Sequence, residues 1–196
     1  MRPGGAYLSD TYISAVAKTL LEIPIRFQSA HPEIFVAHAD TDFLKDMSTT
    51  AIARDSVQLL ELQSTLERIS KLPQATIAKI EGFARGGGHE FALACDMRFA
   101  ARGKAKFMQM EVGMGILPCG GGASRMARQV GLGRALEIIL GAQDFDADQA
   151  EAYGTVNRTF EPDEIAFTED LSDIPDGRFS NSRHSVLSGS MSVSIS

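Results

Sequence analysis

Residues 84–96 read ARGGGHEFALACD, in which three glycines precede His89, Glu90 and an apolar run. Glycine is a poor helix former, so the cluster itself is not typical of a helix interior. The residues before it, ATIAKI at 75–80, are typical of a buried strand. We therefore predict a strand that leads into a glycine turn, followed by a helix from about residue 88 to residue 96.

This arrangement places an accessible backbone beside a carboxylate. The first turn of a helix exposes N–H groups that have no partner within the helix, and it carries a partial positive charge. Gly87 or Gly88 in that turn would let a ligand approach the backbone closely. Such an N–H suits a developing oxyanion, and Glu90 can exchange protons. The alternative is structural: the glycines ease packing and Glu90 favours the helix dipole. These residues alone leave both interpretations open.

Strands and helices are expected to alternate along the rest of the chain. Short extended segments are expected at 25–29 and 34–37, 97–100, 105–109 and 155–160. Helical spacing of apolar residues is found in the segments 9–23, 40–47, 55–72, 123–130, 133–141 and 146–154. The alternation predicts an α/β or α+β protein of repeated strand–strand–helix units.

Composition excludes several classes of protein. The chain has 196 residues, 44% apolar and 22% charged, which is typical of one globular domain. A net charge of −6 gives no support to nucleic-acid binding. No apolar stretch is long enough to span a bilayer, and the first residues lack an export signal. The two cysteines form no CxxC pair, so we expect free thiols and a cytoplasmic location.

Motifs for metals and nucleotide cofactors are incomplete. His89 and Glu90 begin a zinc-protease motif, but Leu93 stands where the second histidine is needed. Neither glycine cluster continues to Gly-Lys-Ser/Thr, and Gly113-Met114-Gly115 is followed by residues that break the dinucleotide fingerprint. We therefore expect no metal and no separate cofactor.

Five segments occur in an order that a known family shares. They read FVAHAD at 35–40, GGGHE at 86–90 with ACD at 94–96, FMQMEVG at 107–113, PCGGG at 118–122, and GAQDFDADQAEAYGTVN at 141–157. They resemble the crotonase (enoyl-CoA hydratase/isomerase) family, whose first four motifs are F-x-A-G-A-D, G-G-G-x-E-x-A-x-x-C-D, F-x-x-P-E and P-G-x-G-G. The resemblance covers residues 2 to about 165, and it implies an α/β fold, a spiral of repeated ββα units.

The resemblance also implies roles for individual residues. It assigns Glu90 and Glu111 as the catalytic carboxylates, and Ala39 and Gly87 as the backbone N–H donors of an oxyanion hole. The remaining substrate-binding positions that it implies are Ala37, His38, Asp40, Gly86 and Gly115. In a hydratase one carboxylate deprotonates water for attack at C3 and the other protonates C2 of an enoyl-CoA thioester. The alternatives are an enoyl-CoA isomerase, and a catalytically idle remnant that acts only in assembly.

The chain departs from the family pattern at several points. His38 replaces a glycine and Met110 a proline, and we interpret His38 and His89 as local packing or hydrogen-bonding residues. The family continues with strands before residue 2 and helices after residue 165, so the chain resembles a member shortened at both ends.

The C-terminal segment differs in composition from the rest. We expect a core at residues 1–165 and, because 166–196 is Ser-rich, a loosely ordered tail in place of the C-terminal helical region. An edge strand at the very end is the less favoured alternative. The partners that the resemblance implies are an acyl-CoA thioester, of which coenzyme A is part, and further copies of the chain in a trimer or hexamer. No nucleic acid or membrane is expected.

Overall fold

A computed structural model describes residues 24–38, 53, 59–167 and 191–195, so the helices expected at 9–23 and 40–47 lie outside the described residues. The described strands are β1 (Ile25–Ser29), β2 (Ile34–Val36), β3 (Thr76–Ile80), β4 (Phe83–Arg85), β5 (Met97–Ala101), β6 (Lys106–Met108), β7 (Phe145–Asp146), β8 (Arg158–Phe160) and β9 (Met191–Ile195). The helices are α3 (Glu61–Ile69), α4 (Gly87–Ala94), η2 (Glu111–Met114, a 3-10 helix), α5 (Gly122–Val130), α6 (Leu132–Gly141), α7 (Ala147–Tyr153) and α8 (Glu164–Phe167).

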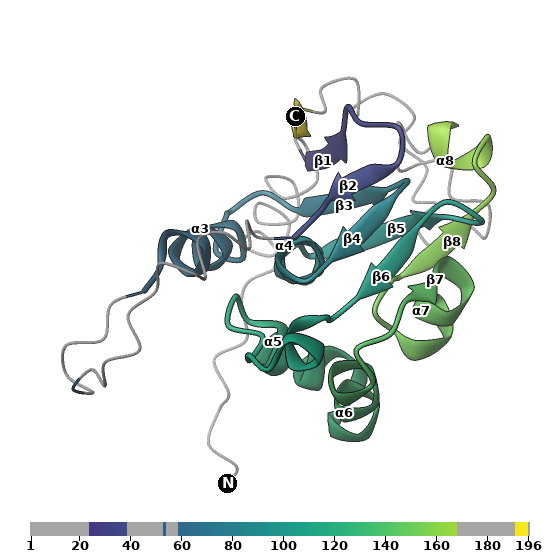
Figure 1. Cartoon of the computed structure of the whole chain (residues 1–196). Coiled ribbons are helices and arrows are strands. Elements are labelled where there is room, and N and C mark those ends of the chain that lie inside the picture. The colour runs from purple at the N-terminus through teal and green to yellow at the C-terminus, as the bar shows by residue number, and fades with distance from the viewer. Residues whose placement is uncertain (1–23, 39–52, 54–58, 168–190, 196) are drawn as a thin grey trace, which may run out of the picture.

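Successive pairs of strands build two sheets at once (Figure 1). One sheet has the order β8-β5-β3-β1-β9 and the other β2-β4-β6-β7. Each of the pairs β1/β2, β3/β4 and β5/β6 gives its first strand to one sheet and its second strand to the other. All pairings are parallel except β6 with β7. The chain therefore advances as a spiral of ββα units, and the α/β prediction is confirmed.

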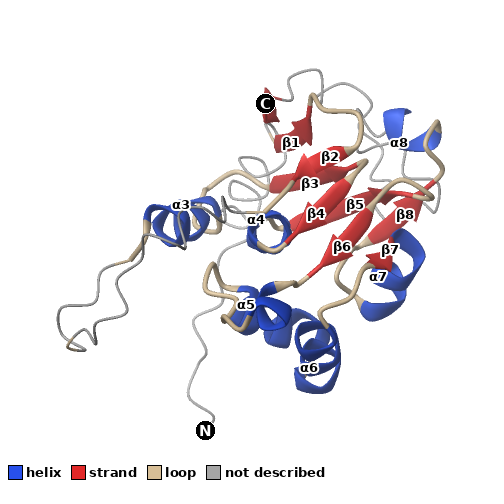
Figure 2. Ribbon diagram, in the orientation of Figure 1, coloured by secondary structure: helices blue, strands red, loops and turns tan. Residues whose placement is uncertain are grey.

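The two strands β3 and β5 of the first sheet are buried on both faces, which explains their largely apolar sequences TIAKI and MRFAA. Ala78 and Ile80 of β3 face the main core with Phe107 and Leu93, whereas Ile77, the residue before Ala78, faces the opposite side and a second cluster with Phe160. Figure 2 shows the strands together, with α5 and α6 below them in this orientation. Among the described residues, no helix is long and apolar enough to cross a membrane.

The helix α3 is shorter than the apolar spacing predicted. It begins at Glu61, and Leu66 is its one fully buried residue, with Ile69 packed partly against the main core. Leu59 and Leu62 belong to the same apolar pattern but lie at the surface, Leu59 with 68% of its area exposed. The spacing therefore identified the helix, but only part of its apolar stripe faces the core.

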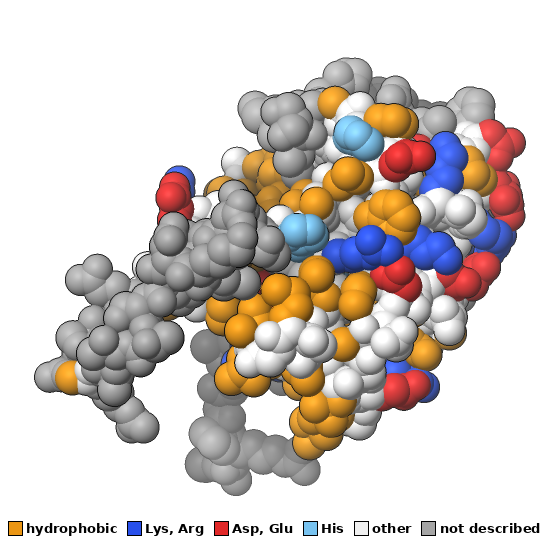
Figure 3. Space-filling view, viewed as in Figure 1, with side chains coloured by type: hydrophobic (Ala, Val, Ile, Leu, Met, Phe, Trp, Pro, Cys, Tyr) orange, Lys and Arg blue, Asp and Glu red, His pale blue; other side chains and the backbone are white. Residues whose placement is uncertain are grey.

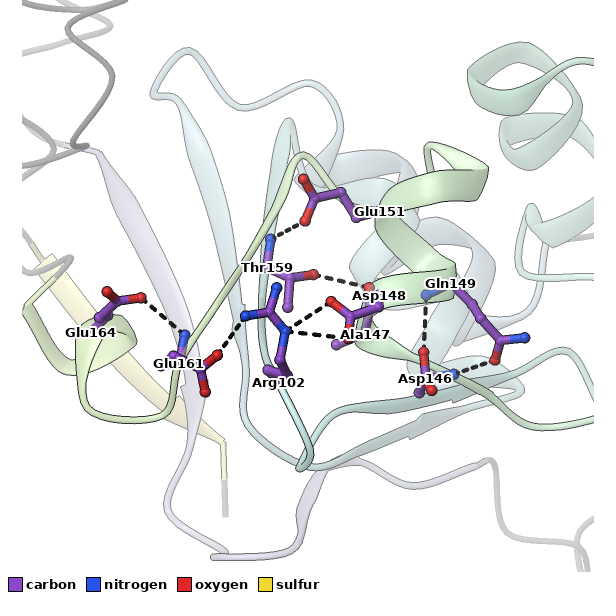
Figure 4. A network of polar contacts seen from close by, with 9 residues as sticks. All are labelled: Arg102, Asp146, Ala147, Asp148, Gln149, Glu151, Thr159, Glu161 and Glu164. Carbon is purple, nitrogen blue, oxygen red and sulfur yellow. Dashed lines mark hydrogen bonds and ion pairs between the residues drawn. The ribbon is translucent and has the colours of Figure 1, made fainter.

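Polar contacts fix the boundaries of the last ββα unit (Figure 4). Asp146 accepts a hydrogen bond of 2.9 Å from the Gln149 N–H, and its own N–H donates to the Gln149 side chain, which forms a capping box for α7. Arg102, just after β5, donates to both Asp148 on α7 and Glu161 after β8. These contacts hold α7 beside β5 and β8. The expected strand at 155–160 is reduced to β8 because its first residues close the end of α7 instead.

Within the segment that we expect to be a loosely ordered tail, the structure describes a strand at residues 191–195. They form β9, which pairs in parallel with β1 from Ile25 opposite Met191 to Ser29 opposite Ile195. The tail has few large apolar side chains to bury, but a strand at a sheet edge pairs through its backbone groups, whatever its side chains are. The boundary expected at residue 165 also falls inside α8.

Candidate active site

The glycine turn brings α4 unusually close to the segment after β2. Gly86 has φ +50°, a conformation that L side chains rarely adopt, and it turns the chain from β4 into α4. A methyl group on Gly88 would overlap the carbonyl oxygens of Val36 and Ala37. Both glycines are therefore needed for the backbone path. The predicted helix is confirmed and starts at Gly87.

The first N–H groups of α4 have no partner within the helix. The Glu90 N–H bonds to the Gly86 carbonyl oxygen at 3.0 Å, but none of the described residues accepts a hydrogen bond from the Gly87 N–H. The partial positive charge of the helix start adds to this donor. The position can therefore receive an anionic oxygen.

Glu90 is a buried carboxylate, with only 2% of its surface exposed. The backbone N–H of Gly122 donates to its Oε1 at 2.8 Å. Burial raises the pKa of Glu90 to about 7, although the N–H groups of Gly122 and Gly120 act to lower it. The negative charge of Glu111 raises it further. Glu90 can therefore both hold and release a proton near neutral pH.

Glu111 lies at the start of η2 and is also buried, with 8% of its surface exposed. Its Oε2 accepts a hydrogen bond of 2.9 Å from Gln109 Nε2. A Cβ at Gly86 would lie 3.2 Å from Oε1 of Glu111, so this carboxylate faces the turn that begins α4. The structure therefore gathers Glu111, Gly86, Gly87 and Glu90 in one place.

A second glycine cluster closes over Glu90. A Cβ at Gly120 would overlap Oε2 of Glu90, and a Cβ at Gly122 would lie 2.9 Å from its Oε1 and 3.0 Å from Gln109 Cδ. Sequence reasoning used this cluster only as a family motif and did not assign Gln109, Gly120 or Gly122 to the site. The signal was present, because consecutive glycines indicate a close backbone approach.

The other expected site residues differ in how firmly the structure places them. Ala37 and His38 follow β2, and the His38 Cβ lies 3.5 Å from the Cβ position of Gly86, beside Glu111. Gly115 ends η2 with φ +75° and is exposed, with open space around it. Ala39 and Asp40 lie outside the described residues.

His89 lies in the core against aromatic side chains. It is completely buried, and its ring lies 5.6 Å from the rings of both Phe107 and Phe145. Burial and the charge of Arg98 lower its pKa to about 3, so it is neutral at ordinary pH. The Gln109 side chain acts to raise the pKa of His89, but no hydrogen bond of normal geometry joins it to the ring. This position supports the interpretation of His89 as a packing residue.

Within the described part of the chain, no three His, Cys, Asp or Glu side chains gather as metal ligands.

A groove lies apart from the two carboxylates. It has a volume of about 270 Å³ and runs between α6, β7 and α7, with Glu137 and Tyr153 among its lining residues. The groove contains neither Glu90 nor Glu111, so it is not the place where the two carboxylates meet.

Known proteins are similar in sequence to this chain. A family model described as enoyl-CoA hydratase/isomerase matches residues 27–169. A short-chain-enoyl-CoA hydratase of Clostridium acetobutylicum is 42% identical over 159 residues, covering 81% of this chain and 59% of that protein. A crotonyl-CoA hydratase of Syntrophomonas wolfei is 41% identical over 131 residues, 67% of this chain and 49% of that protein. The chain thus spans about half the length of the curated relatives that it matches.

Solved structures share the fold. An enoyl-CoA hydratase from Bacillus anthracis superposes with a TM-score of 0.65 at 29% identity, over 82% of this chain and 64% of that one. Pseudomonas aeruginosa DspI superposes with a TM-score of 0.65 at 28% identity, over 85% of this chain and 70% of that one. Sequence, fold and the paired glutamates agree: the chain belongs to the enoyl-CoA hydratase/isomerase family.

Proposed function

We propose that this protein catalyses the reversible addition of water to a short-chain 2-enoyl-CoA thioester. The observation that carries the proposal is the meeting of Glu90 and Glu111, two buried carboxylates from different elements, beside the glycine start of α4. Hydration needs a proton acceptor, a proton donor and a stabilised enolate, and this site supplies groups for all three.

The thioester oxygen would accept hydrogen bonds from the backbone N–H groups of Gly87 and Ala39. Gly87 has the geometry for this role, because its N–H lies at the start of α4 and has no acceptor among the described residues. When water adds to C3, negative charge develops on this oxygen as the enolate forms. Loss of one such donor typically costs a factor of about 10²–10³ in kcat.

The two carboxylates would move the protons. The proposed reaction needs one ionised and one protonated carboxyl group, and a pKa of about 7 lets Glu90 hold or release a proton near neutral pH. The ionised group takes a proton from water as the oxygen bonds to C3, and the protonated group gives its proton to C2. The C2–C3 double bond is thereby converted to a single bond. The pH dependence of this reaction belongs to the pair rather than to either residue.

The proposed substrate class rests on the relatives. Those named above act, by their names, on short-chain enoyl-CoA and crotonyl-CoA. The positions that would hold the CoA thioester are Ala37, His38, Asp40, Gly86 and Gly115. Coenzyme A enters as part of the substrate, and the proposed reaction uses no separate cofactor.

We also propose that the chain works as a homo-oligomer, a trimer or a hexamer, in the cytoplasm. Support for assembly comes from α6, where Leu132, Leu136 and Leu140 form a row of exposed leucines; 67% of Leu132 and 63% of Leu140 are exposed. Figure 3 shows hydrophobic side chains gathered on the lower part of the face in view, where Figure 1 places α5 and α6.

The test is an assay of the purified chain with two substrates. Hydration of crotonyl-CoA is followed by loss of the enoyl absorbance, and isomerisation by conversion of a 3-enoyl-CoA to the conjugated 2-enoyl-CoA. We expect hydration with the first substrate. Conversion of only the 3-enoyl-CoA would favour an isomerase, and inactivity toward both would favour a role in assembly alone.

A further inference from the structure

We propose that Arg125 is a positioning residue, which holds residues 120–122 against the carboxylate of Glu90 and thereby sets the geometry of that carboxylate. These three residues are called the 120–122 loop below. The inference deepens the proposed function, because it identifies what keeps one of the two glutamates in place.

Arg125 joins the 120–122 loop to a neighbouring helix. It lies in the first turns of α5, and its Nη1 donates a hydrogen bond of 2.8 Å to the Gly120 carbonyl oxygen. Its Nη2 donates to Oε2 of Glu67 on α3 at 3.2 Å. Only 16% of the Arg125 side chain is exposed, so water competes weakly for these contacts. The guanidinium group is therefore held at both ends.

The same loop touches Glu90 on its other side. The Gly122 N–H donates to Oε1, and Gly120 leaves no room for a Cβ beside Oε2. A displacement of the loop would therefore move the groups that contact both oxygens of the carboxylate. A second bond from α3 supports this loop, since Gln63 Nε2 donates to the carbonyl oxygen of Cys119 at 3.0 Å.

Arg125 also acts on Glu90 through its charge. Among the described cations it is the one that lowers the pKa of Glu90, against the larger effect of burial and the charge of Glu111. The segments that pack against α4 carry other titratable or charged side chains, namely His38, Glu61, Glu67, Arg68, Arg85, Cys119 and Arg128. Glu67 is paired with Lys71 and Arg125, and Arg85 with Asp144. Among the described charged side chains, Arg125 is thus the one whose charge offsets part of the cost of burying the Glu90 charge.

The direct test measures the titration of Glu90 by NMR in protein labelled with carbon-13 at the glutamate carboxyl, with Glu90→Gln to assign the signal. In Arg125→Met we expect the Glu90 midpoint to move to higher pH than in the wild type. In Arg125→Lys, which keeps the charge but not both hydrogen bonds, we expect a smaller shift. Arg128→Met, an exposed arginine on the same helix, serves as the matched control and should leave the midpoint unchanged.

Kinetics with crotonyl-CoA provide the second measurement. Loss of a hydrogen bond from a charged donor should lower kcat about 10-fold in Arg125→Met. KM should change by less than about 2-fold, because the loop, and not the CoA contacts, is disturbed. Arg125→Lys should recover part of kcat.

The outcomes separate this inference from the proposed function. Wild-type protein without hydratase activity contradicts the proposed function, but the NMR comparison still tests Arg125. A Glu90 midpoint and a kcat in Arg125→Met equal to those of Arg128→Met would overturn the inference. If Arg125→Met does not fold, Glu67→Gln replaces it, since it removes one anchor of Arg125; it must then lower kcat by a smaller factor, and an unchanged kcat counts against the role.

Discussion

Gly122 donates its backbone N–H to Oε1 of Glu90 at 2.8 Å, which joins the two glycine-rich segments of the chain across 32 residues. The contact explains why both segments contain glycine. The first brings the start of α4 against the chain after β2, and the second brings a backbone donor against the carboxylate that α4 carries. The site is therefore formed by backbone approach as much as by side chains.

Gly122→Ala should lower kcat by at least about 10-fold. Its Cβ would lie 2.9 Å from Glu90 Oε1 and 3.0 Å from Gln109, so both must shift and the hydrogen bond must lengthen. A lost hydrogen bond to a charged group costs about 1.5–3 kcal/mol. The measurement is kcat for crotonyl-CoA alongside the melting temperature. A fully active and normally stable Gly122→Ala protein would contradict the role of this contact.

Gly88→Ala should destabilise the fold rather than alter catalysis selectively. The added methyl group would overlap two backbone carbonyl oxygens after β2, which cannot rotate away as a side chain can. We expect a loss of about 3 kcal/mol or more in the free energy of unfolding.

Gly133→Ala is the matched control for this substitution. Gly133 lies in α6 with nothing within 4 Å of its Cβ position, so alanine should be neutral or stabilise by up to about 1 kcal/mol. Urea unfolding of the two variants provides the comparison. Equal stabilities would mean that α4 does not approach the β2 segment as closely as described.

Gln109→Leu should reduce kcat about 10-fold with little change in overall stability. The substitution removes the hydrogen bond of 2.9 Å from Gln109 Nε2 to Glu111 and places an apolar side chain of similar size in this fully buried position. Gln143→Leu, at an exposed position, is the control. Wild-type kcat in Gln109→Leu would show that Glu111 does not need this donor.

The parts of the site that depend on adjacent residues could be predicted from the sequence, whereas contacts between residues far apart in the chain could not. The start of α4 follows from local rules, because a strand, three glycines and an apolar run occupy adjacent residues. The contacts of Gly120 and Gly122 with Glu90 are long-range, so no local pattern indicated which side chain the second cluster would meet. Gln109 was missed for a different reason, because its hydrogen bond to Glu111, two residues later, depends on the path of the backbone from β6 into η2.

Two other differences have physical causes of their own. Leu59 and Leu62 fit a helical apolar pattern, but spacing cannot indicate which part of a stripe the rest of the fold covers. The strand β9 was disfavoured because its segment is Ser-rich, yet strand pairing uses backbone groups that every residue has. Composition predicts burial better than it predicts pairing.

The Glu90 carboxyl should make stability depend on pH. Its pKa is about 7 in the folded protein and 4.5 without the fold, so between these values the folded state keeps a proton that the unfolded state has released. The contribution of Glu90 to stability therefore falls as pH rises through this window, by about 3 kcal/mol in all.

Glu90→Gln removes this dependence. The free energy of unfolding of the variant minus that of the wild type should increase from pH 4.5 to pH 7 and then level off. The difference is the proper quantity, because neutral His89 gives the opposite slope below its ordinary pKa of 6.5 in both proteins. Parallel stability curves for the two proteins would contradict a raised pKa at Glu90.

The central claim, that Glu90 and Glu111 act together as a proton-transfer pair, is tested most directly by kcat for crotonyl-CoA hydration in Glu90→Gln and Glu111→Gln. Each is expected to lower kcat by about 10²–10⁴-fold while binding of the acyl-CoA persists. Glu137→Gln, an exposed glutamate in the separate groove, is the control and should match the wild type. Near-normal kcat in both glutamine variants at the site would contradict the account.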